Sequence, residues 1–392
     1  MAKLSPDRFM SRREFLRMVA ALGGGAALAA FLEGCSQAEI AQVTAISPSG
    51  TPELPTTTQE SAPTMTPTQE EIMPTETQPA PTPTATEAID DGIARLAFVK
   101  TSDRLEGVRK AIALLGFNPV AGKSVFLKPN FNSADPTPGS THPEVLRALV
   151  TALKAMSATK ITVGDRSGMG DTRRVLEKLG VFELADELGF DTVVFDELGA
   201  DDWVMIQPEG GHWKKGFPFA RPCLEAEALV TTCCLKTHRY GGHFTLSLKN
   251  SVGMVGKRIP QDEHNFMDEL HSSAHQRRMI AEINAAYTPA LVVLDGVEAF
   301  ISGGPDDGER VSPAVILAGT DRIALDATGV ALLRYYGCKT EAAKGKIFHQ
   351  QQIARAIDLG LGVDGPEKIA FLTGDEESAA YGEKIRGVLL EG

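Results

Sequence analysis

Short apolar segments alternate with amphipathic helical patterns from about residue 93 to the end of this 392-residue chain, and no other feature limits its fold as strongly. Short runs rich in β-branched and apolar residues predict strands, and longer segments with helical spacing predict helices between them. Strands joined through helices pair in parallel and bury both faces of their sheet. The sequence therefore predicts an α/β fold with a mostly parallel sheet covered by helices on both faces.

The expected boundaries follow from the apolar runs and from turn and capping residues. Strands are expected at residues 95–100, 124–127, 160–163, 192–195, 229–235, 290–294, 315–318 and 369–372. Helices are expected at residues 104–115, 143–156, 172–188, 262–286 and 323–336. A segment rich in glycine, proline and aromatic residues interrupts the alternation, so we expect a small excursion or subdomain near residues 200–222.

Residues 1–35 have the pattern of a targeting leader. Residues 11–17 resemble the twin-arginine export motif, and the apolar run 18–32 after them is too short and too rich in glycine and alanine for a membrane span. The run that ends in Cys35 resembles a lipobox, in which this cysteine would be lipidated and would anchor the protein to a membrane. Because Glu33 is unusual there, cleavage by an ordinary signal peptidase stays an alternative. We expect export by the twin-arginine translocation machinery to the cell envelope.

Residues 36–92 form a low-complexity segment dominated by threonine and proline. No lysine or arginine occurs between residues 18 and 94, and too few apolar residues are present to offset the chain entropy that folding removes. We expect a disordered stalk that holds an α/β domain at residues 93–392 away from a membrane surface. The formal net charge of −12 argues against nucleic acid as a partner.

Polar side chains follow five of the expected strands. Ligands of open parallel sheets bind beyond the carboxyl ends of the strands, so these side chains are candidates for a binding site. Several of them are also common turn formers, but lysine is not, and it is costly to bury without a partner. We therefore expect the lysines to face an anion. The strand-end residues are Lys128, Asn130, Asp165, Lys236, His238, Asp295 and Asp321.

The densest cluster of such residues lies in residues 229–257. An apolar strand leads into a group of cations and imidazoles, and a diglycine turn then allows close approach of the backbone to a ligand. The alternating run after this turn is interpreted as a second strand. The candidate residues in this stretch are Lys236, His238, His243, Lys249 and Asn250.

Two further groups of residues could ligate a divalent metal. Histidines share one face of the expected helix 262–286, with a carboxylate between them. Carboxylates on neighbouring strand ends could also hold a cation through oxygen, although Asp321 could equally cap the next helix. The candidate metal ligands are Asp295, Asp321, His264 and His271.

The five cysteines show no CxxC spacing, which argues against an iron–sulfur cluster bound by this chain. Cys233 and Cys234 are adjacent in an apolar strand, so their side chains point to opposite faces. This placement favours two buried core thiols over a catalytic pair. The identity of any cofactor stays open.

Eight short motifs occur in a fixed order between about residues 100 and 333. They are Lys128-Pro129-Asn130, Thr141-His142-Pro143-Glu144, Gly164-Asp165, Lys236-Thr237-His238, Leu248-Lys249-Asn250 with Gly253, Asp295-Gly296, Gly304-Pro305 with Gly308, and Asp321 with Asp326. Together they resemble the domain of unknown function 362 family, whose name assigns no reaction. Some members carry four-iron four-sulfur segments, and this chain lacks the cysteine runs that such segments need.

We interpret the chain first as an exported enzyme that binds an anionic substrate or cofactor, with or without a metal. The lysines would bind the anion, the asparagines would orient it, and one histidine would transfer a proton or ligate the metal. The candidate catalytic residues are Lys128, Lys236, His238 and His243. The candidate ligand-binding residues are Asn130, His142, Asp165, Lys249 and Asn250.

Two alternatives stay open at this point. The first is a non-catalytic, surface-anchored protein that binds an anionic solute or a metal, and tight binding without turnover would favour it. The second is an electron-transfer accessory protein that lacks an iron–sulfur motif of its own. The sequence assigns no reaction, substrate, metal or oligomeric state.

Overall fold

The computed structural model describes residues 91–260 and 262–392. The predicted leader with Cys35, and the predicted stalk up to residue 90, lie outside the described residues. The first described strand, β1 (Ala94–Lys100), begins close to the expected start of the α/β domain. Within the described ranges, no helix combines the length and the apolar character that crossing a membrane requires.

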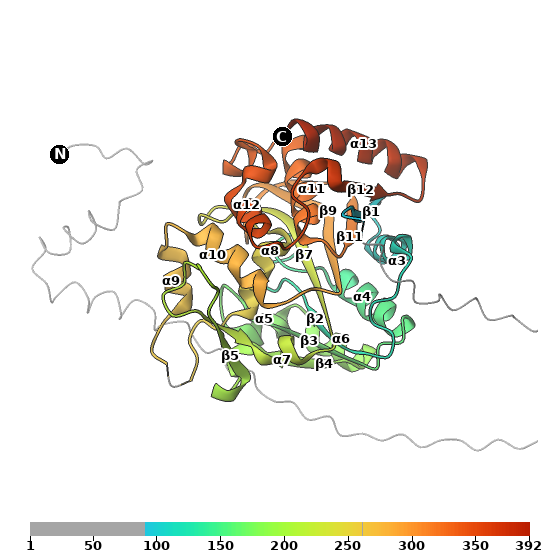
Figure 1. Ribbon diagram of the computed structural model, residues 1–392. Coiled ribbons are helices and arrows are strands. Elements are labelled where there is room, and N and C mark those ends of the chain that lie inside the picture. The colour runs from blue at the N-terminus through green and yellow to red at the C-terminus, as the bar shows by residue number, and fades with distance from the viewer. Residues whose placement is uncertain (1–90, 261) are drawn as a thin grey trace, which may run out of the picture. The chain divides into compact units, whose positions relative to one another are not determined.

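A mixed sheet of ten strands lies at the centre of these residues (Figure 1). Its other strands are β2 (Ser124–Lys128), β3 (Lys160–Asp165), β4 (Asp191–Val194), β7 (Ala228–His238), β8 (His243–Phe244), β9 (Leu291–Gly303), β10 (Gly308–Val311), β11 (Val315–Gly319) and β12 (Ile369–Leu372). The main path has the order β12-β1-β11-β9-β7-β2-β3-β4, while β10 and β8 pair with β9 and β7. Only β11 on this path runs opposite to its neighbours. The predicted mostly parallel sheet is confirmed.

Helices cover both faces of the sheet, as the sequence predicts (Figure 1). On one face lie α3 (Arg104–Leu115), α4 (Pro143–Ala155), α5 (Thr172–Lys178) and α6 (Val181–Leu188). On the other face lie α8 (Leu246–Asn250), α10 (Gln276–Ile283), α11 (Arg322–Tyr335), α12 (Gln351–Asp358) and α13 (Glu376–Glu391). The remaining described α-helices are α7 (Arg221–Glu225) and α9 (Phe266–Ser272).

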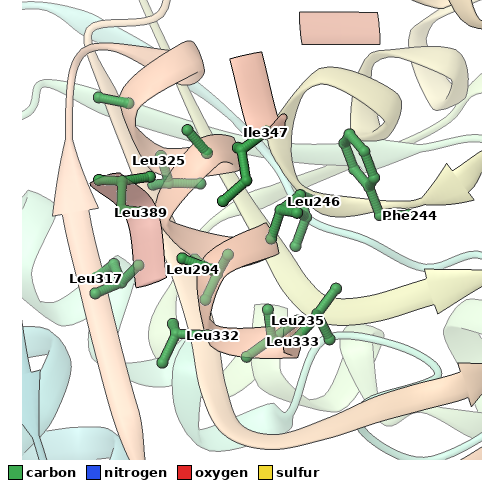
Figure 2. Packing of buried hydrophobic residues seen from close by; sticks show 14 of the residues in the cluster. Leu235, Phe244, Leu246, Leu294, Leu317, Leu325, Leu332, Leu333, Ile347 and Leu389 are labelled. Carbon is green, nitrogen blue, oxygen red and sulfur yellow. The ribbon is translucent and has the colours of Figure 1, made fainter. Parts of the chain in front are cut away.

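The core on the α11 face anchors the short helix α8. Figure 2 shows Leu246 among the leucines of this core, which include Leu235 of β7 and Leu294 of β9. Gly329 of α11 permits this packing, because a Cβ atom there would lie 2.8 Å from Leu246 Cδ1. Complete burial of one leucine side chain stabilises a fold by about 1.5–3 kcal/mol, so Leu246 is a strong anchor for α8.

The predicted excursion is a separate two-stranded antiparallel sheet. It pairs β5 (Trp203–Ile206) with β6 (Phe217–Ala220). Its aromatic side chains form a third core together with side chains of α9 and α10. The excursion therefore covers the end of the main sheet through apolar contacts.

Two expected helices are wrong in length. The side chain of Asn265 caps α9 by accepting the backbone N–H groups of two residues that follow it, and extended backbone at Ser273 separates α9 from α10. The expected helix 262–286 is therefore two short helices. Gly180, in the left-handed conformation, likewise divides the expected helix 172–188 into α5 and α6.

Candidate functional site

A small cavity lies at the carboxyl ends of β2, β3 and β7. Its volume is about 40 Å³, which is room for about three water molecules. The predicted residues that line it are Lys128, Asn130, Asp165, Lys236, His238, Lys249 and Asn250. The lining also includes Asn132, Arg166, Thr245 and Gly253, which the sequence analysis did not assign to the site.

Lys128 is held at the end of β2 by three acceptors. Its Nζ lies 2.8 Å from Asp165 Oδ1, and it donates to Pro129 O at 2.6 Å and to Asn250 Oδ1 at 2.8 Å. An ammonium group has three N–H donors, so Lys128 has none left for a ligand. Lys128 therefore has no donor for the anion that the sequence predicts, and instead it orients Asp165 and Asn250.

Lys236 keeps one N–H group free. Its Nζ donates to Gly139 O at 2.5 Å and to Pro305 O at 3.1 Å, and both of these acceptors are neutral. The side chain is completely buried, and among the described residues it has no ion-pair partner. Burial lowers the pKa of Lys236. The free N–H group and the uncompensated charge make this lysine an anion-binding candidate.

The helix α8 carries Lys249 into the cavity. The carboxylate of Asp326 in α11 accepts the backbone N–H groups of Ser247 at 2.7 Å and Leu248 at 3.0 Å. These bonds use N–H groups that the first turn of a helix leaves without partners. The expected strand through this segment is therefore wrong, because a distant carboxylate fixes the start of a helix here.

Lys249 has the least satisfied ammonium group in the cavity. Its side chain is 9% exposed, and it has no hydrogen-bond or ion-pair partner among the described residues. Burial, and then the positive charges of Lys236 and Arg166, lower the pKa of Lys249 to about 7. The lysine therefore exists in both protonation states near neutral pH.

Positive charge exceeds negative charge around the cavity. Arg166 donates to the backbone carbonyls of Ser167, Val252 and Val255, and it has no carboxylate partner among the described residues. Asp165 is the one carboxylate in the described lining, and Lys128 already neutralises it. An anion between the remaining cations would offset the cost of burying them.

Two asparagines form a fixed hydrogen-bond network at the cavity wall. Asn250 Nδ2 donates to Thr232 O at 3.0 Å, so Asn250 Oδ1 faces Lys128 and accepts from Asn130 Nδ2 at 3.4 Å. This leaves Asn130 Oδ1 buried without a donor, and Thr245 Oγ1 is also buried without a partner in the described protein. Buried polar atoms are nearly always paired, so both atoms are candidates for ligand contact.

His238 lies at the end of β7 against the diglycine turn. A Cβ atom at Gly242 would lie 3.0 Å from His238 Nδ1 and 2.7 Å from Lys249 Cε, so only glycine lets the turn pack on both side chains. Burial, and then the charges of Lys249 and Lys236, lower the pKa of His238, which keeps the imidazole neutral. Its role in proton transfer stays a prediction.

Two other predicted histidines do not line the cavity. His142 caps α4, and its Nδ1 accepts the N–H group of Glu144 at 3.2 Å. His243 Nδ1 lies 3.4 Å from Gln350 Oε1. Both side chains therefore have structural neighbours away from the lysines, and the geometry gives them no place in the site.

The predicted carboxylate ligands of a metal are separated by the sheet. Asp295 does not end a strand, because β9 continues to Gly303, and its Oδ2 pairs with Arg104 Nε at 2.9 Å. Asp321 follows the reversed strand β11, so it lies at the opposite edge of the sheet from the cavity. There it caps α11 by accepting the N–H group of Ala324. The structure does not bring these two carboxylates together.

The predicted histidine ligands do not share a helix, because α9 begins at Phe266, after His264. His264 precedes α9, and its Nε2 lies 2.6 Å from Glu269 Oε2. His271 Nδ1 lies 2.7 Å from Met267 O, one turn earlier in α9. In residues 91–260 and 262–392, no group of three or more histidine, cysteine, aspartate or glutamate side chains could hold a metal ion.

The cysteines of the described residues belong to the core. Cys223, Cys233, Cys234 and Cys338 are buried free thiols. Burial raises the pKa of Cys234 to about 11, so this thiol is protonated and unreactive at neutral pH.

Comparisons with known proteins identify a family and one relative. Residues 125–331, more than half of the chain, match the family model described as Domain of unknown function (DUF362). A thylakoid-associated protein of Synechocystis is 27% identical over 208 residues, which are 52% of this chain and 61% of that protein. The lactate racemase apoprotein of Thermoanaerobacterium thermosaccharolyticum aligns over 76% of this chain and 88% of its own, with 14% identity and a TM-score of 0.35. That structural likeness is too weak to carry an argument about function.

Proposed function

The chain belongs to the family known as Domain of unknown function (DUF362), and from this premise we propose that it is an enzyme acting on a small anionic molecule bound between Lys236 and Lys249. One observation carries the proposal. Both lysines are buried beside Arg166, and no carboxylate among the described residues forms an ion pair with any of the three, although Asp306 attracts Lys236 and Asp165 and Asp196 attract Arg166 from further away. A bound anion is the simplest compensation for this charge.

Lys249 is the group in the cavity that suits proton transfer. Lys249, with a pKa of about 7, can exchange a proton near neutral pH, and general acid–base catalysis is most effective under that condition. The strongly lowered pKa of His238 keeps its imidazole neutral and makes it a poor proton acceptor, so it can hydrogen-bond a ligand but is not the base. The proposed reaction class is therefore proton transfer to or from an anionic substrate.

A binding survey followed by a turnover assay tests this function. Full-length protein is mixed with acetate, phosphate or sulfate at constant ionic strength, and the melting temperature is measured against a chloride reference. Specific binding raises the melting temperature with ligand concentration. If acetate binds, nuclear magnetic resonance in D₂O then detects exchange of the carbon-bound hydrogens of acetate and of other small carboxylates. No anion-specific shift in any sample would contradict the proposal.

A second candidate function is capture of the anion without chemistry. The small cavity favours it, because about 40 Å³ leaves little room for a second reactant. A bound anion that is recovered unchanged and without hydrogen exchange would support capture. Both functions share the same binding site and differ only in turnover.

We also propose that the protein is exported and anchored at a membrane surface. The support is the twin-arginine pattern at residues 11–17 and the lipobox-like run that ends in Cys35. The name of the Synechocystis relative associates that protein with a membrane system. Cell fractionation tests this proposal. Replacing Arg12 and Arg13 with lysine should retain the protein in the cytoplasm, and Cys35→Ala should release it from the membrane fraction.

A further inference from the structure

The polar atoms without partners in the cavity define the ligand more closely than the positive charge of the cavity does. This step rests on the proposed anion site and names the chemistry of its ligand. The free donors are the ammonium group of Lys249 and the remaining N–H group of Lys236. Asn130 Oδ1, whose residue is 6% exposed, is the unpartnered lining atom that can only accept, whereas Asn132 Nδ2 can only donate and Thr245 Oγ1 and His238 Nδ1 can do either.

The orientation of Asn130 follows from its neighbours. Asn250 Oδ1 already accepts from Lys128 Nζ at 2.8 Å, so the group that faces it must be a donor. A reversed Asn130 amide would place two oxygens against each other. Asn130 Oδ1 is therefore the acceptor that remains at the cavity wall, and a buried carbonyl oxygen without a donor is costly.

The charge of the cavity restricts which donor can satisfy Asn130. A ligand ammonium group would meet the positive charges of Lys236, Lys249 and Arg166, and like charges at short range repel. A neutral hydroxyl group adds a donor without adding positive charge. The free donors of the two lysines remain for the anionic oxygens of the ligand.

The volume sets the size of the ligand. A cavity of about 40 Å³ has room for about three waters, each with a share of about 30 Å³ in the liquid, so only an anion of a few non-hydrogen atoms can replace them. We propose that the cavity selects a small oxyanion that carries its own hydroxyl group, with the anionic oxygens on Lys236 and Lys249 and the hydroxyl hydrogen donated to Asn130 Oδ1. Glycolate and inorganic phosphate share this chemistry.

Matched pairs of anions test the proposal by isothermal titration calorimetry of the full-length protein at pH 6.5. Glycolate is compared with acetate, a monoanion that lacks the hydroxyl group, and phosphate with sulfate, which lacks the hydroxyl group and at this pH also carries more negative charge. We expect the hydroxylated member of at least one pair to bind about 5–10-fold more tightly, the effect of one hydrogen bond to a buried acceptor. The pair that shows this preference identifies the carboxylate or the phosphate class.

The variant Asn130→Ala should abolish this preference while the non-hydroxylated anions keep their affinity. Equal affinities within both pairs in the unmodified protein would overturn the hydroxyl proposal and leave the anion site intact. Tighter binding of glycine than of glycolate would overturn it as well. Failure of all four anions to bind would instead contradict the proposed function, so the two failures are distinguishable.

Discussion

Lys128 and Asp165 form a buried ion pair at the ends of two neighbouring parallel strands, with Nζ 2.8 Å from Oδ1. The three acceptors around Lys128 use all of its donors, whereas Lys249, which also lines the cavity, has no hydrogen-bond or ion-pair partner among the described residues. One lysine of the cavity is therefore part of its framework, and another is available to a ligand.

Asp165→Asn should strongly destabilise the fold. The substitution leaves the ammonium group of Lys128 buried without its carboxylate, and breaking a buried pair from one side costs about 3–5 kcal/mol. Urea denaturation followed by circular dichroism measures the loss. Asp191→Asn removes one partner of the exposed pair with Lys160 and serves as the control with little expected effect. Similar stabilities for both variants would contradict a framework role for Asp165.

The stability of the protein should increase with pH above neutrality. The pKa of Lys249 is about 7 in the folded chain, whereas an unfolded lysine titrates near about 10.4. Between these values the unfolded chain binds more protons, so the free energy of unfolding rises with pH, by at most about 1.4 kcal/mol per pH unit for one group. Denaturation curves from pH 6 to 9 measure this slope. Lys249→Met should have a smaller slope, and an unchanged slope would show that Lys249 keeps an ordinary pKa.

Gly242→Ala should impair anion binding more than it impairs folding. The added Cβ would lie 2.7 Å from Lys249 Cε, so the lysine must move away from its place in the cavity. We expect about a tenfold loss of affinity, equivalent to about 1.4 kcal/mol. Gly387→Ala is the matched control, because a Cβ there meets no atom within 4 Å. Equal affinities of the two variants would show that the turn does not shape the site.

The carboxyl ends of the parallel strands could be predicted from the sequence, and with them much of the cavity wall. Lys128, Asp165 and Lys236 each follow an apolar strand, and parallel pairing brings such positions to one edge of the sheet. The dense cluster in residues 229–257 supplied Lys249 and Asn250 as companions of these residues. Arg166 and Thr245 were missed because neighbouring loop residues give no periodic signal.

The errors have a common physical origin in contacts between distant parts of the chain. Asp321 was placed with the other strand ends because the sequence does not show that β11 runs in reverse. The segment at Lys249 alternates like a strand, yet the carboxylate of Asp326 converts it to a helix. Local pattern cannot reveal either effect, since both depend on tertiary contacts.

Calorimetric titration of acetate, glycolate, phosphate and sulfate into three proteins tests the central claim most directly. The proteins are the unmodified chain, Lys249→Met, and Lys384→Met, which removes one positive charge from an exposed position of α13. The account predicts that the tightest-binding anion loses at least about tenfold in affinity in Lys249→Met and nothing in Lys384→Met. Equal affinities in all three proteins, with the fold of each intact by circular dichroism, would contradict it.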